Sequence, residues 1–154
     1  MKRIFSTFLA LAVSATLVFV VTSWKHSLGP VHAQGGCSVA TLTGNYAFSN
    51  PGFTTPAKGV KGNQVPTAAV GVFAFDGAGN ISASYAIAFR GTTSQGQSAS
   101  GTYSVNSDCT GSISFTTGDA AGINENLVII GGGTEFFGIV TSPSFTVTLD
   151  GKKQ

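Results

Sequence analysis

Two cysteines are the first residues whose chemistry must be decided. Cys37 and Cys109 could supply a nucleophile, metal ligands or a disulfide. Both histidines, His26 and His32, lie in a segment that we interpret below as a cleaved signal. A cysteine–histidine pair, a catalytic triad and a zinc site therefore lack partners in the remaining chain. An even cysteine count in an exported protein favours a disulfide, with two free thiols as the alternative.

Carboxylates are the remaining candidates for acid–base chemistry. Glu135 borders an expected strand beside bulky apolar residues. If its side chain points inward, burial would raise its pKa, and it could act as an acid or base with Tyr103, or else Tyr46 or Tyr85. A carboxylate on the rim is the alternative. The other acidic residues fall in expected turns: Asp76, Asp108, Asp119, Glu125 and Asp150.

Large aromatic rings are numerous, with 12 Phe and 3 Tyr. They either fill the core or line a cavity in which tyrosine hydroxyls provide polar contacts. If there is a cavity, the candidate ligand-binding residues are Tyr46, Phe73, Tyr85, Tyr103, Phe115 and Phe137.

Residues 1–33 have the composition of an export signal. A basic start, Met1–Lys2–Arg3, precedes a long apolar run, and small residues precede an expected cleavage site after Ala33. The run is almost long enough to span a bilayer, so an uncleaved membrane anchor is the alternative. Cleavage leaves residues 34–154 as one domain, secreted or periplasmic and without further membrane contact.

The composition of residues 34–154 excludes several classes of function. Five basic side chains stand against six acidic ones, a net charge of −1, so nucleic-acid binding has no electrostatic basis. No phosphate-binding glycine motif occurs. The "DGAGN" segment at 76–80 holds one carboxylate, which is too few for a calcium loop. We expect neither a metal nor a cofactor.

Short segments with alternating apolar and polar residues follow one another along residues 34–154, separated by glycine-rich turns. This pattern is typical of antiparallel all-β folds. The short links favour a single eight-stranded meander barrel, with a two-sheet sandwich as the alternative. The link at 49–67 is expected to be a binding loop or disordered, and the tail at 150–154 to fray. The expected strands are 42–48, 68–75, 81–89, 98–106, 111–117, 126–131, 135–140 and 145–149.

Four stretches carry a resemblance to known proteins: "LTGNYAF", "GVFAFDGAGNIS", "GTYSVNSDCTGSISF" and "EFFGIV". They resemble small secreted bacterial domains similar in architecture to the allene oxide cyclase and dirigent barrels and, more loosely, to the lipocalin-like calycins. The resemblance covers most of residues 37–149. It implies a barrel that can hold a pocket for an apolar molecule, and no catalytic residue is transferred by it.

Three hypotheses about function follow. The first is a non-enzymatic secreted barrel that binds a small apolar ligand or a cell-surface partner. The second is a cofactor-free cyclase or isomerase that uses Glu135 and a tyrosine such as Tyr103. The third is a structural envelope protein, for which the outer faces rich in serine and threonine would be suited. The state of the barrel interior, filled or hollow, separates these hypotheses.

Overall fold

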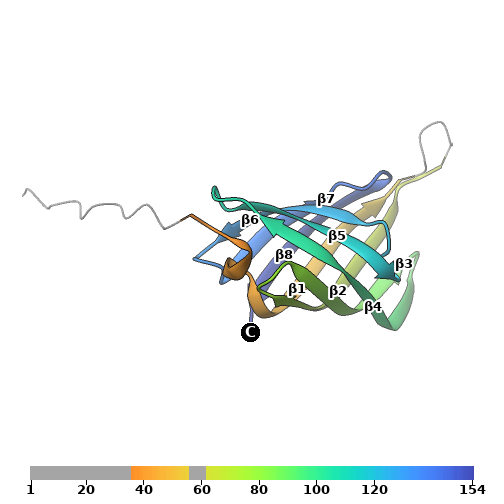
Figure 1. Ribbon diagram of the computed structural model, residues 1–154. Helices are drawn as coiled ribbons and strands as arrows, with labels where there is room; N and C mark the ends of the chain where they lie inside the picture. The colour runs from red at the N-terminus through yellow and green to blue at the C-terminus, as the bar shows by residue number, and fades with distance from the viewer. Residues whose placement is uncertain (1–35, 56–61) are drawn as a thin grey trace, which may run out of the picture. The chain divides into compact units, whose positions relative to one another are not determined.

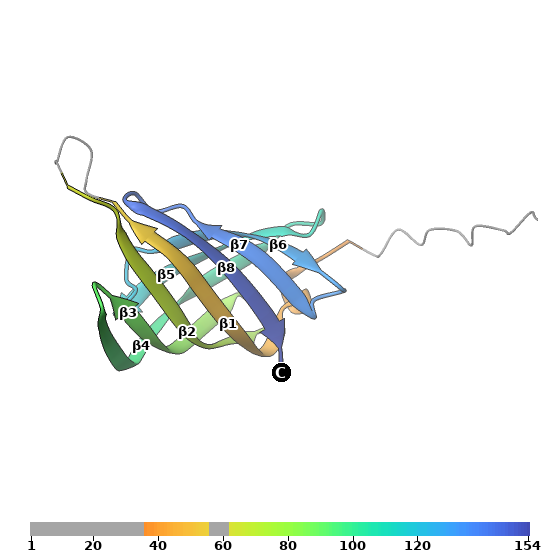
Figure 2. The same ribbon diagram turned by 180° about the vertical axis from the view of Figure 1, so that it is seen from behind.

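The chain forms a closed barrel of eight antiparallel strands in the computed structural model, which describes residues 36–55 and 62–154. Each strand pairs with the next, and β8 pairs with β1 to close the barrel (Figure 1, Figure 2). The expected meander barrel is confirmed over the sandwich. The elements are η1 (Val39–Thr41), β1 (Thr43–Thr54), β2 (Val65–Asp76), β3 (Asn80–Phe89), β4 (Thr92–Val105), β5 (Thr110–Gly118), β6 (Asn124–Ile130), β7 (Glu135–Val140) and β8 (Phe145–Lys153).

Side-chain alternation along the strands separates an apolar interior from a polar outer face. On β4, Ala99 and Tyr103 are buried, whereas Ser98, Ser100 and Thr102 are exposed. Successive strand side chains point to opposite faces, which is why the period-2 sequence pattern located the interior. The buried core contains a continuous set of rings: Tyr46, Phe48, Phe73, Phe75, Tyr103, Phe115 and Phe136.

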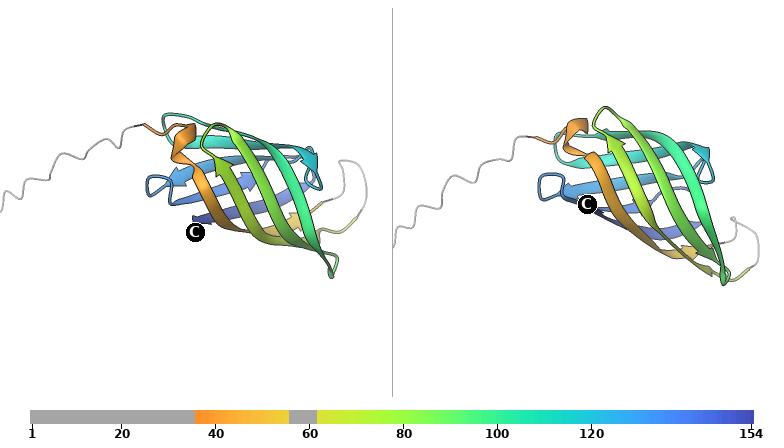
Figure 3. Two further views of the ribbon diagram at one scale, coloured as in Figure 1. Left: turned by 60° about the horizontal axis from the view of Figure 1, so that its bottom comes forward. Right: turned by 90° about the horizontal axis from the view of Figure 1, so that it is seen from below.

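Several strands extend further than the apolar pattern indicated. Part of the expected link, as far as Thr54, continues β1, and β2 begins at Val65. The tail is not frayed, because β8 pairs with β1 up to Lys153 and Tyr46. Closing a sheet into a barrel requires inclined strands with staggered ends (Figure 3). Polar strand ends are thus paired although no apolar side chain marks them.

One end of the barrel, which we call the plugged end, is closed by η1. Val39 packs against the core, and Leu42 is fully buried. The Tyr103 hydroxyl lies 2.9 Å from the Val39 carbonyl oxygen and 2.8 Å from that of Leu42. The hydroxyl of Tyr46 donates to the carbonyl oxygen of Gly133, in the turn between β6 and β7. Two buried tyrosines therefore hold the backbone that closes this end.

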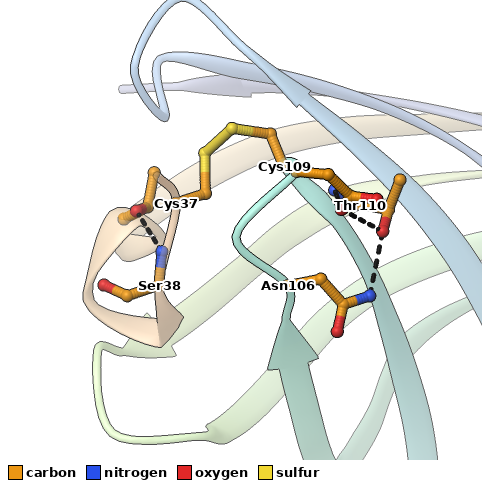
Figure 4. Close-up of a disulfide and its surroundings, with 7 residues drawn as sticks. Cys37, Ser38, Asn106, Cys109 and Thr110 are labelled. Carbon is orange, nitrogen blue, oxygen red and sulfur yellow. Dashed lines mark hydrogen bonds between the residues drawn. A yellow bond between two sulfur atoms is a disulfide. The ribbon is translucent and has the colours of Figure 1, made fainter. Parts of the chain in front are cut away.

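The predicted disulfide is confirmed. Cys37 is bonded to Cys109, with 5.0 Å between their Cα atoms and a sequence separation of 72 (Figure 4). The Cys37 N–H also donates to the Ser107 carbonyl oxygen at 3.3 Å. The bridge thus fastens the segment before η1 to the turn between β4 and β5. Disulfides of this kind are typical of oxidising compartments outside the cytosol.

The predicted signal at 1–33 lies outside the described residues, as does the centre of the link at 49–67. Within the ranges 36–55 and 62–154, no helix has the length and apolar character needed to cross a membrane.

Candidate functional site

A cavity of about 170 Å³ occupies the half of the barrel opposite η1, which we call the cavity end. Its walls come from the strand ends on that side and from the connection between β5 and β6. Asp119 and Phe145 line the cavity and are both exposed, so it communicates with solvent at its rim. The barrel interior is therefore filled at one end and hollow at the other.

Aromatic rings separate the two halves. Phe48 and Phe73 stack with their ring centroids 3.9 Å apart, and both line the cavity. Phe73 also contacts Phe115 at 5.8 Å on the cavity side and Phe136 at 6.4 Å on the filled side. Phe136 is fully buried and does not line the cavity. The stacked pair thus belongs to both a packed core and the apolar floor of the cavity.

Small side chains account for the empty volume. Ala69, Ala83 and Ala120 line the cavity at positions where other parts of the core carry rings or branched chains. Protein interiors pack densely, so alanines from separate elements beside bulky residues leave space that a second molecule can occupy. The remaining apolar wall includes Ile87 and Val147.

Glu125 is the buried carboxylate of this site. It lies on β6, points inward like Leu127 and Ile129, lines the cavity and is 2% exposed. Its Oε2 atom is buried without a hydrogen-bond partner among the described residues. Burial away from water disfavours the charged form and raises the pKa of Glu125 to about 7. At neutral pH the cavity therefore holds a carboxyl group that can gain or lose a proton.

Further polar groups line the cavity. The buried Oδ1 atom of Asn50 has no hydrogen-bond partner within the described part of the chain. Asp119 is positioned at the rim, because its Oδ2 accepts the Ser98 N–H at 3.0 Å. Burial, together with the negative charge of Asp119, raises the pKa of Tyr85. The Tyr85 hydroxyl is therefore a neutral donor at physiological pH.

Only some of the residues predicted to bind a ligand line the cavity. Phe73, Tyr85 and Phe115 line the cavity as expected. Tyr46 and Tyr103 lie in the filled half, where their hydroxyls bind backbone carbonyl oxygens. These two tyrosines support the plugged end and do not face the cavity.

Glu135 and Phe137 are corrections to the sequence analysis. Phe136 occupies the inward position on β7, so its neighbours on both sides point outward. Phe137 is 46% exposed, next to Val128 on the outer face. The Glu135 Oε1 atom lies 3.9 Å from the Lys152 Nζ atom, and its side chain is 32% exposed. Glu135 is therefore a carboxylate on the rim, which was the alternative expectation from the sequence.

Glu125 lies one residue before the expected strand, where the sequence predicts a turn, so its inward position on β6 was not predicted. Counting back in steps of two from Leu127 would have placed it inside. No group of three or more potential metal ligands occurs in residues 36–55 and 62–154.

Comparisons with models of protein families, with curated proteins and with solved structures find no match to this chain.

Proposed function

We propose that this protein is an exported barrel that binds a small apolar ligand in its half-hollow interior. The observation that supports the proposal is the cavity itself, about 170 Å³ bounded by the Phe48–Phe73 pair, Phe115 and Val147. An apolar cavity of about 150 Å³ is large enough for benzene. The ligand would therefore be about the size of one aromatic ring.

The presence of a cavity in an otherwise densely packed barrel also supports the binding of a ligand. The filled half already contains a ring network, in which Phe75 meets Tyr46 and Tyr103 edge to face at 5.3 and 4.9 Å. Export to a secreted or periplasmic location is proposed from the signal-like residues 1–33 and agrees with the disulfide.

The test is the binding of ethylbenzene, measured by ligand-detected NMR. Ala83→Leu places a larger side chain inside the cavity, whereas Ser84→Leu places the same side chain on the outer face of the same strand. We expect ethylbenzene to bind the wild type and Ser84→Leu, and to lose most of its affinity for Ala83→Leu. Absence of binding to folded wild-type protein, or equal binding to both variants, would contradict the proposal.

Acid–base catalysis is a second candidate, favoured by the presence of Glu125 and Tyr85 in one cavity. An ionised Glu125 could take a proton from the carbon beside a carbonyl group while the Tyr85 hydroxyl donates to the carbonyl oxygen. Glu125 replaces Glu135 in this version of the isomerase hypothesis. Protein-dependent deuterium exchange at the α-carbons of cyclohexanone, lost in Glu125→Gln, would support it. Exchange at the rate of buffer alone would exclude it.

A further inference from the structure

The charges that line the cavity are all of one sign. Glu125 lies inside and Asp119 lies at the rim, and no lysine or arginine is among the described lining residues. The nearest sequence neighbours of the rim are also uncharged, at Ala120, Ala121 and Gly122. Among the described residues that line this cavity, a ligand meets acidic groups and no cationic side chain, an arrangement that opposes an anion.

Glu125 has an unused hydrogen-bonding position. Its Oε2 atom is buried without a protein partner among the described residues, and Asn50 Oδ1 is in the same state in the same cavity. A buried acceptor without a donor costs free energy, and a charged acceptor costs more than a neutral one. Both oxygens would be satisfied by a ligand that brings several N–H groups to the cavity.

From this arrangement we infer that the ligand is a small hydrophobic amine, bound as its ammonium ion against the Glu125 carboxylate. The inference rests on the proposed function and names the class of ligand. An ammonium group offers three donors and no acceptor, which matches the unpaired oxygens. Its hydrocarbon part would lie against the apolar walls.

The rings of the cavity suit a cation as well as a hydrocarbon. Phe48, Phe73, Tyr85 and Phe115 all line it, and the negative face of an aromatic ring attracts a nearby ammonium group. The attraction is greatest where water is excluded, as it is around Glu125 at 2% exposure. Rings and carboxylate therefore favour the same kind of ligand.

The charge state of Glu125 sets the pH dependence of binding. The carboxyl must ionise to hold an ammonium ion, so affinity for an amine should rise as the pH passes through about 7. The titratable groups that share the cavity with it are Asp119 and Tyr85. Its partners on the adjacent strands, Ile113 and Val140, do not titrate.

The experiment compares three probes of similar shape: benzylamine, benzyl alcohol and ethylbenzene. Dissociation constants are measured by NMR titration of the disulfide-bonded protein at pH 8.0 and 5.5. At pH 8.0 we expect benzylamine to bind at least about tenfold more tightly than ethylbenzene, with benzyl alcohol between them. At pH 5.5 this preference should shrink, while ethylbenzene affinity changes little.

Variants assign the preference to one residue. Glu125→Gln keeps the shape of the side chain and removes its charge, so it should abolish the preference for benzylamine over ethylbenzene. Asp119→Asn, at the exposed rim, should cause a smaller loss because water screens its charge. The amide NMR spectrum of each variant, compared with that of the wild type, shows whether it is folded.

The outcomes separate this inference from the proposed function. Ethylbenzene binding with no preference for benzylamine at pH 8.0, or with a preference that survives Glu125→Gln, overturns the inference and leaves the proposed function intact. Failure of all three probes to bind the folded wild type overturns both. If Glu125→Gln does not fold, the loss of preference between pH 8.0 and 5.5 in the wild type decides the matter.

Discussion

Gly151 lies directly opposite Phe136 on the neighbouring strand, and the ring of Phe136 fills the space that a side chain on Gly151 would need. Gly151 is also paired with Phe48 on β1, at the closure of the barrel. Phe136 is fully buried and lies between Tyr46 and Phe73, with ring centroids 5.5 and 6.4 Å away. The absence of a side chain at Gly151 therefore allows the ring network to continue across the closing strand.

Gly151→Ala should destabilise the barrel. The added Cβ would overlap the Phe136 ring, and overpacking of a dense core costs about 1–3 kcal/mol. The measurement is the free energy of unfolding in urea. Asp150→Ala, one residue away and pointing outward, is the control and should change it little. Phe136→Leu replaces the ring by a smaller side chain and should therefore partly rescue the stability of Gly151→Ala in a double-mutant cycle. Fully additive effects of the two substitutions would contradict the contact between these residues.

Tyr103→Phe should weaken the attachment of η1. The lost hydroxyl lies between the carbonyl oxygens of Val39 and Leu42, so the variant leaves a buried acceptor unpaired. The expected cost is about 1–3 kcal/mol in the free energy of unfolding. Tyr85→Phe is the matched control, because the Tyr85 hydroxyl has no hydrogen-bond partner among residues 36–55 and 62–154, and it should cost less. Equal costs would mean that the two carbonyl contacts contribute nothing.

Removal of the disulfide should lower stability by about 4 kcal/mol. The bridge closes a loop with a sequence separation of 72, and the estimate is the chain-entropy cost of such a loop. The Cys37→Ser, Cys109→Ser double variant is compared with the wild type in urea, with and without dithiothreitol. Cys109 has a φ of +67°, and serine keeps that backbone strain, so the comparison isolates the cross-link. Dithiothreitol should destabilise the wild type only. An unchanged unfolding midpoint in the double variant would contradict the estimate.

The sequence predicted the barrel because alternation is a local signal. Ile81, Ala83 and Tyr85, or Ile113 and Phe115, mark the inner face wherever apolar side chains recur every second residue. The Cys37–Cys109 bridge was likewise predictable, since only one pairing exists. Strand ends rich in glycine, serine and threonine carry no such mark. Pairing of Lys153 with Tyr46 arises from closure between the two ends of the chain, which local pattern does not report.

The candidate site was harder to predict because it depends on contacts between strands. Phe136 and Phe137 are adjacent, and the sequence does not say which of them points inward. The Gly151 position opposite Phe136 settles the choice through packing. Similarly, Glu125 resembled a turn acid because a charged residue rarely occupies an inward strand position.

Glu125 should make the stability of the barrel fall as the pH rises. Burial raises its pKa from 4.5 to about 7. Between these values the folded protein holds a proton that the unfolded chain has released, so the free energy of unfolding decreases with pH. The stabilising contribution is complete below pH 4.5 and is lost as the pH passes through about 7. At about 1.4 kcal/mol per pH unit, the loss amounts to about 3 kcal/mol.

Glu125→Gln isolates this effect, because glutamine has a similar shape and does not titrate. We expect the wild type to lose about 3 kcal/mol relative to Glu125→Gln between pH 4.5 and pH 8, measured by urea unfolding at each pH. Asp76 and Asp108 have lowered pKa values, through hydrogen bonds from Asn80 and Thr110, and their contributions cancel because both proteins contain them. A constant difference across this range would show that Glu125 ionises as freely in the barrel as in the unfolded chain, and its charge would then not change near neutral pH.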